Sequence, residues 1–163
     1  MSATLQSNAG EQKRILVAHC GDYSFGIDIM SLVDVIQRLK ATPVPLSLPH
    51  IMGLVNLRGQ IITEINVARS LQIKDSITTT GFDEGYSLIV NKGGQFYGFA
   101  FDSVGNVLDV NESDLKTIPE TVSQTWRSLS RGIYKNGDQL IITLDLHYLI
   151  DHLTNLAEQE VAA

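Results

Sequence analysis

Short runs in which apolar and polar residues alternate, separated by turn-forming residues, make up most of this chain. Alternation places successive side chains on opposite faces of an extended backbone, so it predicts strands. We expect strands at residues 14–19, 86–90 and 95–101. The run from Asn91 to Gly94 predicts a hairpin turn between the last two strands. The Asn136-Gly137 pair predicts another, because both central residues of such a turn favour positive φ.

The pattern occurs twice. The residues from Phe25 to Leu32 resemble those from Tyr97 to Val104 at an offset of 72 (97 − 25). A second match follows at an offset of 79 (139 − 60), between 60–67 and 139–146. Two long copies are too few for a solenoid, which stacks three or more short units. They predict two similar sub-domains, which would form a groove between them and expose two separate outer faces.

The segment from Ile29 to Leu39 has apolar residues at helical spacing. Its second copy contains Gly105 and Asn106, which do not favour a long helix. We therefore expect a short helical turn followed by a strand. Prolines 43, 45 and 49 predict an extended connector after it, because residues before proline avoid the helical region.

A longer helix is predicted near the end of the chain. Asp145 is placed to cap its N-terminus, and Asn66 holds the equivalent position before a shorter turn that ends near Leu71. The helix presents an apolar stripe that we expect to pack across the sheets. The stripe consists of Leu146, Leu149, Ile150, Leu153 and Leu156. Many short strands with one terminal helix predict a pair of small barrels.

Composition narrows the class of protein. The chain has 163 residues, of which 44% are hydrophobic and 18% charged, as in folded globular proteins. Its net charge of −6, without a basic cluster, argues against a nucleic acid or an anionic membrane as partner. No apolar run is long enough for a membrane span, and a single cysteine, Cys20, fits a cytoplasmic protein. We expect a disordered tail at 1–12, a folded region at 13–157 and a flexible tail at 158–163.

No catalytic constellation emerges from the sequence. His19 and Cys20 are adjacent in a predicted strand, so they point to opposite faces and cannot act as a base and nucleophile pair. His147 and His152 have poor spacing for a shared metal ion. An aspartic-protease dyad is excluded because Met30 stands where the second copy has Asp102. We therefore expect neither an enzyme nor a cofactor.

The stretch from Gly53 to Ile62, with Asn56-Leu57-Arg58-Gly59 at its centre, resembles the signature of the CheW family of chemotaxis coupling proteins. Segments 25–35, 101–107 and 132–149 resemble three further family motifs in the same order. This resemblance implies an all-β fold with a C-terminal helix, built from two intertwined five-stranded SH3-like barrels.

The resemblance also implies a non-enzymatic adaptor. Its expected partners are the cytoplasmic tip of a methyl-accepting chemoreceptor and the regulatory domain of a CheA-type histidine kinase, in membrane-associated receptor arrays. The implied receptor-binding residues are Arg58, Leu32, Asn56 and Gly59, while the kinase-binding residues are not identified. An adaptor for a pilus or phototaxis pathway remains an alternative to flagellar chemotaxis.

Arg58 and Leu32 also have ordinary structural interpretations. Arg58 aligns with Gly137, which places it at an exposed hairpin tip, where it is either a partner contact or a solvated turn residue. Leu32 is either an apolar anchor beside the groove or a core residue. Gly53 and Gly59 are expected to matter for backbone shape.

The chain departs from the family pattern at Thr63-Glu64-Ile65-Asn66-Val67, where the family tends to have proline, two aliphatic residues, aspartate and leucine. Alternation predicts that Glu64 lies on a polar surface with Asn66. Two other classes of function stay open on the sequence alone, a ligand-sensing β-barrel domain and a hydrolase with an unrecognised site.

Overall fold

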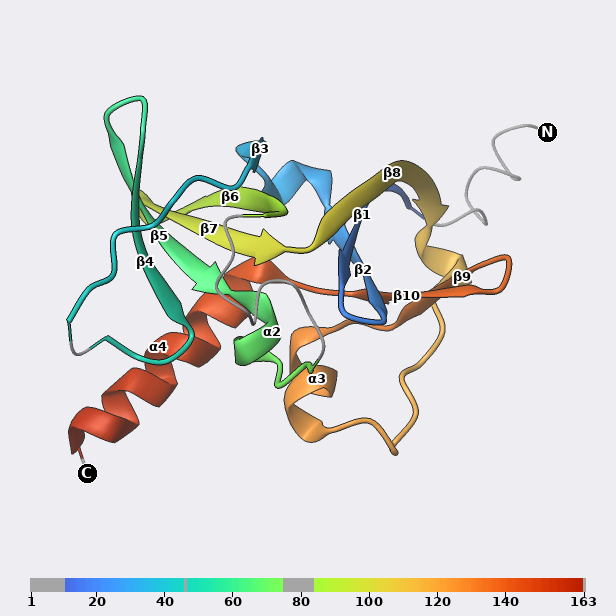
Figure 1. Cartoon of the computed structure of the whole chain (residues 1–163). Helices are drawn as coiled ribbons and strands as arrows, with labels where there is room; N and C mark the ends of the chain where they lie inside the picture. Colours follow the sequence, from blue (N-terminus) through green and yellow to red (C-terminus); the bar gives the residue numbers. More distant parts are fainter. Residues whose placement is uncertain (1–10, 46, 75–83, 163) are drawn as a thin grey trace.

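The protein folds into two five-stranded barrels, visible side by side in Figure 1. The computed structural model describes residues 11–45, 47–74 and 84–162, with the backbone alone for 158–162. Most of the predicted N-terminal tail, residues 1–10, lies outside the described residues. Barrel 1 has the strand order β8-β1-β2-β10-β9, with bounds β1 (Gln12–Cys20), β2 (Tyr23–Asp28), β8 (Ser103–Asn111), β9 (Ile133–Asn136) and β10 (Gln139–Thr143). Barrel 2 has the order β3-β6-β7-β5-β4, with bounds β3 (Asp34–Gln37), β4 (Ile51–Leu57), β5 (Gln60–Asn66), β6 (Tyr86–Lys92) and β7 (Gln95–Phe101).

The two sequence copies are intertwined. The first copy contributes the β1–β2 hairpin to barrel 1 and then crosses over, so that β3, β4 and β5 belong to barrel 2. The second copy contributes the β6–β7 hairpin to barrel 2 and crosses back with β8, β9 and β10. Each barrel therefore needs strands from both copies, and neither copy forms a barrel alone.

Strand register confirms the repeat residue by residue. In barrel 1, Thr143 of β10 pairs in parallel with Gly26 of β2. In barrel 2, Glu64 of β5 pairs in parallel with Gly98 of β7. These pairs are related by the offsets of 79 and 72 found in the sequence, since 64 + 79 = 143 and 26 + 72 = 98. The barrels are thus equivalent in topology and in pairing.

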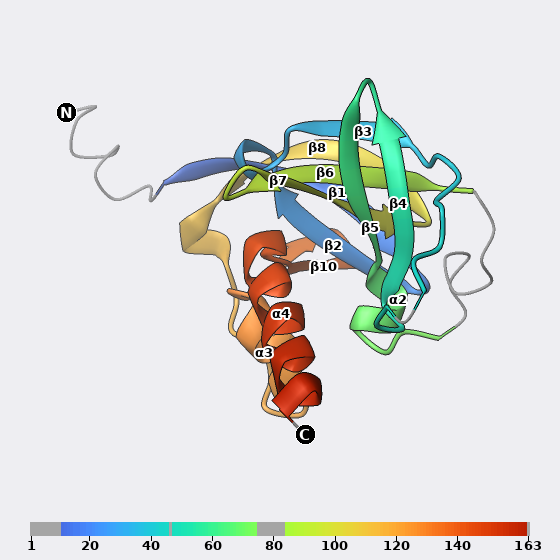
Figure 2. The same ribbon diagram turned by 90° about the vertical axis from the view of Figure 1, so that its left-hand side faces the viewer.

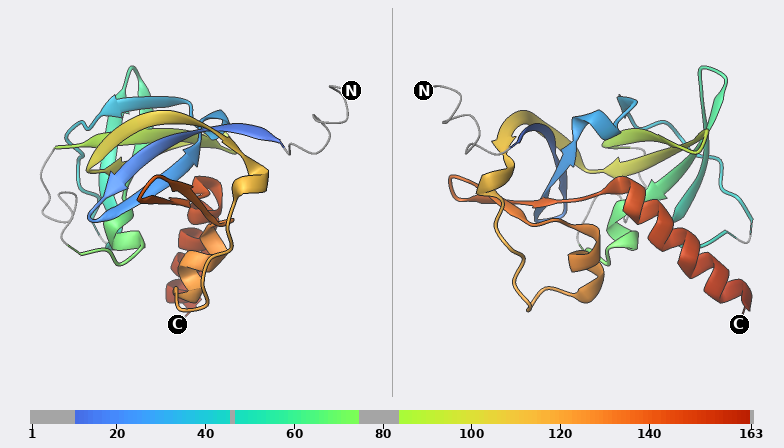
Figure 3. Two further views of the ribbon diagram at one scale, coloured as in Figure 1. Left: turned by 90° about the vertical axis from the view of Figure 1, so that its right-hand side faces the viewer. Right: turned by 180° about the vertical axis from the view of Figure 1, so that it is seen from behind.

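Short helices connect the strands, and one longer helix ends the chain. They are η1 (Ile29–Ser31), α2 (Val67–Ser70), η3 (Glu112–Asp114), α3 (Gln124–Leu129) and α4 (Leu146–Ala162). Figures 2 and 3 show α4 leaving the sheets at an angle, so its C-terminal part projects from the barrels. Asp145 Oδ1 accepts a hydrogen bond from Tyr148 N (3.1 Å), and Asn66 Oδ1 accepts one from Arg69 N (3.1 Å). Both predicted caps are confirmed.

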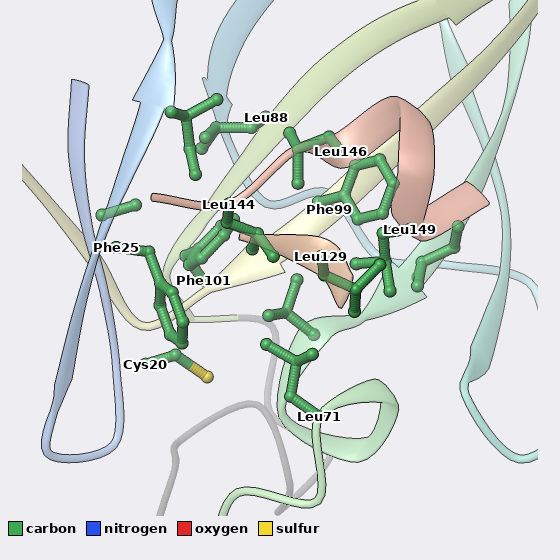
Figure 4. Close-up of a cluster of buried hydrophobic side chains, with 14 of the residues drawn as sticks. Cys20, Phe25, Leu71, Leu88, Phe99, Phe101, Leu129, Leu144, Leu146 and Leu149 are labelled. Atoms are coloured by element: carbon green, nitrogen blue, oxygen red, sulfur yellow. The ribbon is translucent and has the colours of Figure 1, made fainter. Parts of the chain in front are cut away.

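The largest hydrophobic cluster lies between the barrels. Figure 4 shows Phe25 of barrel 1, Phe99 and Phe101 of barrel 2 and Leu149 of α4 converging there. Each barrel also has a small cluster of its own, around Ile141 in barrel 1 and Ile62 in barrel 2. The central strands therefore bury both faces, one in the barrel and one in the shared core.

The predicted strands are confirmed, and the turn-then-strand interpretation of 29–39 matches η1 and β3. Three details differ. The β9–β10 turn is centred on Gly137 and Asp138, because Asn136 still pairs with Gln139. Leu156, placed on the apolar stripe of the last helix, is 41% exposed. The helix also continues to Ala162, into the segment predicted as a tail.

Candidate functional site

The β4–β5 hairpin carries three of the four predicted site residues at its end. Leu57 pairs with Gln60, so Arg58 and Gly59 are the two central turn residues. Their φ angles are 52° and 86°, the combination of a type I′ turn. Figures 1 and 2 show this hairpin projecting beyond the rest of barrel 2. The predicted exposed position of Arg58 at a hairpin tip is confirmed.

Arg58 holds a backbone conformation that an arginine rarely adopts. Positive φ brings the Cβ of an L-residue close to its own carbonyl oxygen, which costs roughly 1–2 kcal/mol outside glycine. Barrel 1 has Gly137 at the equivalent position, with φ 62°. None of the ion pairs among the described residues involves Arg58. Its guanidinium therefore remains available to a partner.

Asn56 stabilises the turn from within. Its Oδ1 accepts a hydrogen bond from Gly59 N (3.1 Å), and the β6–β7 turn has the same contact between Asn91 Oδ1 and Gly94 N (3.0 Å). The structure thus gives Asn56 and Gly59 a shared role in shaping the turn that presents Arg58.

Leu32 lies elsewhere, directly after η1 where the chain crosses from barrel 1 to barrel 2. It is half-buried and packs against the central cluster. Its neighbours Met30 and Val33 are 87% and 58% exposed, and neither was predicted to be a surface residue. Alternation could have predicted the exposure of Val33, because Val33 and Val35 lie on the opposite face of the extended chain from Leu32 and Ile36.

The polar surface predicted at Glu64 and Asn66 is wrong. Only 2% of Glu64 and 4% of Asn66 are exposed, so both residues are buried. The alternation was correct, but the face opposite Ile65 points into barrel 2 rather than to solvent. Ser87 Oγ donates a hydrogen bond to Glu64 Oε2 (2.9 Å), and Arg38 Nε lies 4.0 Å from Oε1. Gly98 leaves the necessary room, because a Cβ there would overlap Oε2.

Burial changes the ionisation of this carboxyl group. Loss of hydration raises the pKa of Glu64 from 4.5 to about 7, although the Ser87 hydrogen bond and the Arg38 charge act in the opposite direction. Arg38 is itself buried, and its Nη1 donates a hydrogen bond to the carbonyl oxygen of Glu84 (3.0 Å). Its Nη2 lies 3.6 Å from Met52 Sδ.

Barrel 1 has an open pocket of about 230 Å³ where barrel 2 holds this buried polar cluster. Gly26, Ile15 and Thr143 line it. At its rim, Lys13 Nζ lies 2.9 Å from Glu112 Oε1, and the hydrogen bond to Glu112 raises the pKa of Lys13. The same contact lowers the pKa of Glu112.

Across the described ranges, no group of three or more His, Cys, Asp or Glu residues is arranged to hold a metal ion. Cys20 is buried in the central cluster, while His19 Nδ1 is 3.0 Å from Ser24 Oγ. The two therefore point to different environments, as predicted. Nor does any helix in the described part of the chain have the length and apolar character to cross a membrane.

Comparison with known proteins shows to which family this chain is similar. A family model described as a CheW-like domain matches residues 14–154. The chain belongs to the CheW-like family. The chemotaxis protein CheW of Thermotoga maritima is 31% identical over 151 residues, covering 91% of this chain and 94% of that protein. The chemotaxis protein CheW of Treponema pallidum is 26% identical over 141 residues, covering 85% and 82% respectively.

A solved CheW-like structure has the same fold. The scaffolding protein TtCheW from Thermoanaerobacter tengcongensis aligns with a TM-score of 0.70 and 27% identity, covering 87% of this chain and 90% of that one. Arg58 and Glu64 both lie within the matched residues 14–154. The hairpin thus carries an exposed arginine at its tip and a buried carboxyl group at its base.

Proposed function

We propose that this CheW-like chain is a non-enzymatic scaffold of chemotaxis signalling that joins a chemoreceptor to a histidine kinase. The receptor partner is the cytoplasmic tip of a methyl-accepting chemoreceptor, and the kinase partner is the regulatory domain of a CheA-type enzyme. Membership of the CheW-like family and the names of its relatives support the scaffold role. Binding to the receptor tip would recruit the chain to membrane-associated arrays.

The conformation of Arg58 is the observation that carries the receptor contact. Glycine or asparagine would fit the first central position of this turn with less strain. An exposed arginine held at φ 52° makes the hairpin less stable than it needs to be, which favours a role in contact with a partner. Its planar guanidinium binds carboxylates in a bidentate manner, and receptor tips could supply such groups.

Leu32 remains a proposed second receptor contact. Met30 and Val33, close to it in the chain, have exposed apolar side chains, and we propose that they form one apolar patch at the crossover between the barrels. Partial burial lets Leu32 support that patch from below while packing on the central core. We therefore propose Leu32 as a positioning residue for an apolar contact, with Asn56 and Gly59 positioning Arg58.

Each barrel also exposes one large apolar side chain at the same repeat position. Ile61 of barrel 2 is 59% exposed, and Leu140 of barrel 1 is 58% exposed (61 + 79 = 140). Both follow the turn of a hairpin, on the outer face of a barrel. They are candidates for kinase contacts, one on each barrel. Several modest contacts of this kind would gain strength in an array through multivalency.

Arg58 variants test the receptor contact directly. We expect Arg58→Glu to weaken binding of a receptor-tip fragment by about 2 kcal/mol, as at an interface hot spot. Arg58→Gly is the matched control for folding, since it removes the guanidinium and relieves the backbone strain. Both variants should bind the kinase regulatory domain with the affinity of the unmodified chain, measured by isothermal titration calorimetry.

Unchanged receptor affinity in both variants would remove Arg58 from the interface. Absence of saturable micromolar binding to the kinase domain, with the chain folded, would contradict the scaffold role. Loss of receptor affinity in Arg58→Glu alone would indicate charge repulsion rather than a contact made by the arginine.

A further inference from the structure

The strongest feature outside the proposed contacts is the polar cluster inside barrel 2. Its three members are Glu64 on β5, Ser87 on β6 and Arg38 directly after β3. The repeat offsets give their equivalents in barrel 1 (64 + 79, 87 − 72 and 38 + 72). These are Thr143, Ile15 and Val110. None of the three carries a charge, so the ionisable cluster is specific to barrel 2.

We propose that Glu64, Ser87 and Arg38 form a reversible proton-binding site that makes the conformation of β4 and β5 depend on pH. This inference goes beyond the scaffold function and does not require a partner. It requires that the full chain stays folded whether the carboxyl group of Glu64 is protonated or ionised.

The geometry provides two different arrangements for the two ionisation states. The gap of 4.0 Å between Arg38 Nε and Glu64 Oε1 is longer than a hydrogen bond. Among the described residues, Oε1 accepts no hydrogen bond. A neutral carboxyl group is stable there at small cost, but an ionised oxygen in a buried site requires a charge or a donor at short range. Ionisation should therefore draw the Arg38 guanidinium toward Glu64.

Movement of Arg38 would be transmitted to two strands. Its Nη1 holds the carbonyl oxygen of Glu84, two residues before β6, and its Nη2 contacts Met52 of β4. Glu64 is paired with Gly53 of β4 on one side and with Gly98 of β7 on the other. A shift of this side-chain pair therefore acts on the base of the hairpin whose tip is Arg58.

Few charged or titratable groups lie near the carboxyl group of Glu64. Arg38 faces Glu64 from the end of β3 and is the charged residue that influences its ionisation. Ser87 from β6, Gly98 from β7 and Gly53 from β4 contribute no titratable side chain. Burial places the pKa of Glu64 at about 7, which agrees with a site that changes state near neutral pH.

Nuclear magnetic resonance of the full chain, labelled with ¹³C at glutamate carboxyl groups, tests the proposal between pH 5 and 9. We expect one carboxyl signal to titrate near pH 7 and to vanish in Glu64→Gln. The Met52 methyl group and the backbone amides of β4 and β5 should shift with the same midpoint. In Glu64→Gln these shifts should be lost, while Glu112→Gln, a change at a half-buried carboxylate that pairs with Lys13 beside barrel 1, should retain them.

A midpoint for Glu64 below about 5 would overturn the proton-binding site. A midpoint near 7 without accompanying shifts in β4 and β5 would show that ionisation of Glu64 does not change the conformation of these strands. Should Glu64→Gln fail to fold, Ser87→Ala gives a second test, because loss of the hydrogen bond to the ionised form should move the midpoint upward. An unmoved midpoint in Ser87→Ala would contradict the assigned geometry. These readouts involve no receptor or kinase, so their failure is distinguishable from failure of the scaffold function.

Discussion

Barrel 1 and barrel 2 share one backbone plan but differ inside. Both pair a glycine of one hairpin with a residue of a parallel strand, Gly26 with Thr143 and Gly98 with Glu64. At this place barrel 1 has a pocket of about 230 Å³, while barrel 2 holds a buried carboxyl group. The topology of the repeat is therefore compatible with very different barrel interiors. One barrel can have an open pocket while the other holds an ionisable group.

The common features are those that fix the backbone. Gly53 and Gly132 occupy equivalent positions with φ 142° and 154°, where the chain passes close to the carbonyl oxygens of Thr42 and Lys116. A side chain at either position would overlap the neighbouring backbone. The sites that differ are interior positions in which a side chain can change without altering strand pairing.

The largest expected difference between the barrels is a pH dependence that comes from barrel 2. The folded chain binds the Glu64 proton more tightly than the unfolded chain, because folding raises its pKa from 4.5 to about 7. The resulting stability is fully present below the unfolded pKa and is lost as the pH rises through about 7. Relative to Glu64→Gln, the free energy of unfolding should fall by about 3 kcal/mol between pH 4.5 and 8.

Urea unfolding of both proteins across this range measures the effect, with Glu112→Gln as the barrel 1 control. Parallel pH profiles for the unmodified chain and Glu64→Gln would show that the buried carboxyl group is not the source. A difference of the opposite sign would mean that Glu64 is ionised in the fold throughout this range.

A smaller difference is expected between alanine substitutions at the two equivalent glycines. A Cβ at Gly98 would overlap Glu64 Oε2 and lie 2.5 Å from Ser87 Oγ, both held in the polar cluster. A Cβ at Gly26 would lie 2.8 Å from Ile15 Cδ1, the flexible end of a side chain beside the pocket, and 2.9 Å from Ile141 Cγ2, so it would meet apolar methyl groups and no hydrogen-bonded atom. We expect Gly98→Ala to lower the free energy of unfolding by about 2 kcal/mol and Gly26→Ala by about 1 kcal/mol.

Thermal unfolding at pH 6, where Glu64 is mostly protonated, is the appropriate measurement. Equal destabilisation in the two variants would indicate that the pocket gives Ile15 no freedom to move. A larger effect at Gly26 would reverse the inferred difference between the two interiors.

The smallest effect concerns the two hairpin tips. Arg58→Gly should raise the free energy of unfolding by about 1 kcal/mol, because glycine adopts a φ of 52° without strain. Gly137→Ala should lower it by a similar amount, since φ there is 62°. Chemical denaturation at one pH measures both. If Arg58→Gly gives no gain in stability, the strain at Arg58 is relieved in solution and ceases to support a functional role.

Much of the architecture could be predicted from the chain alone. The repeat offsets gave equivalences that the strand registers confirm, and the caps at Asn66 and Asp145 were read from their positions before apolar segments. The exposed tip position of Arg58 followed from its alignment with Gly137. Its strained φ was not predicted, although the alignment with Gly137, a residue expected to have positive φ, carried the signal, and the pairing of Leu57 with Gln60 places Arg58 in that turn.

The candidate site was predicted less completely. Alternation along β5 identified two faces, but it could not say that both are buried from Glu64 to Asn66, whereas Gln60 and Ile61 next to the turn are exposed. In that buried part, one face of β5 packs in the core between the barrels and the other in barrel 2, so a polar residue there lies inside. Glu64 was assigned to the surface for this reason. Arg38 lies beside Glu64 because β3 and β5 belong to one barrel. The spacing of residues in the sequence does not reveal this proximity.

The sequence by itself determined the repeat, the strand pattern, the helix caps and membership of a recognisable family, because these depend on residues close together in the chain. Only the tertiary structure decided that each barrel combines strands from both copies and that Glu64 is buried beside Arg38. Burial and ionisation depend on what surrounds a side chain in space, and strands far apart in the sequence supply those surroundings.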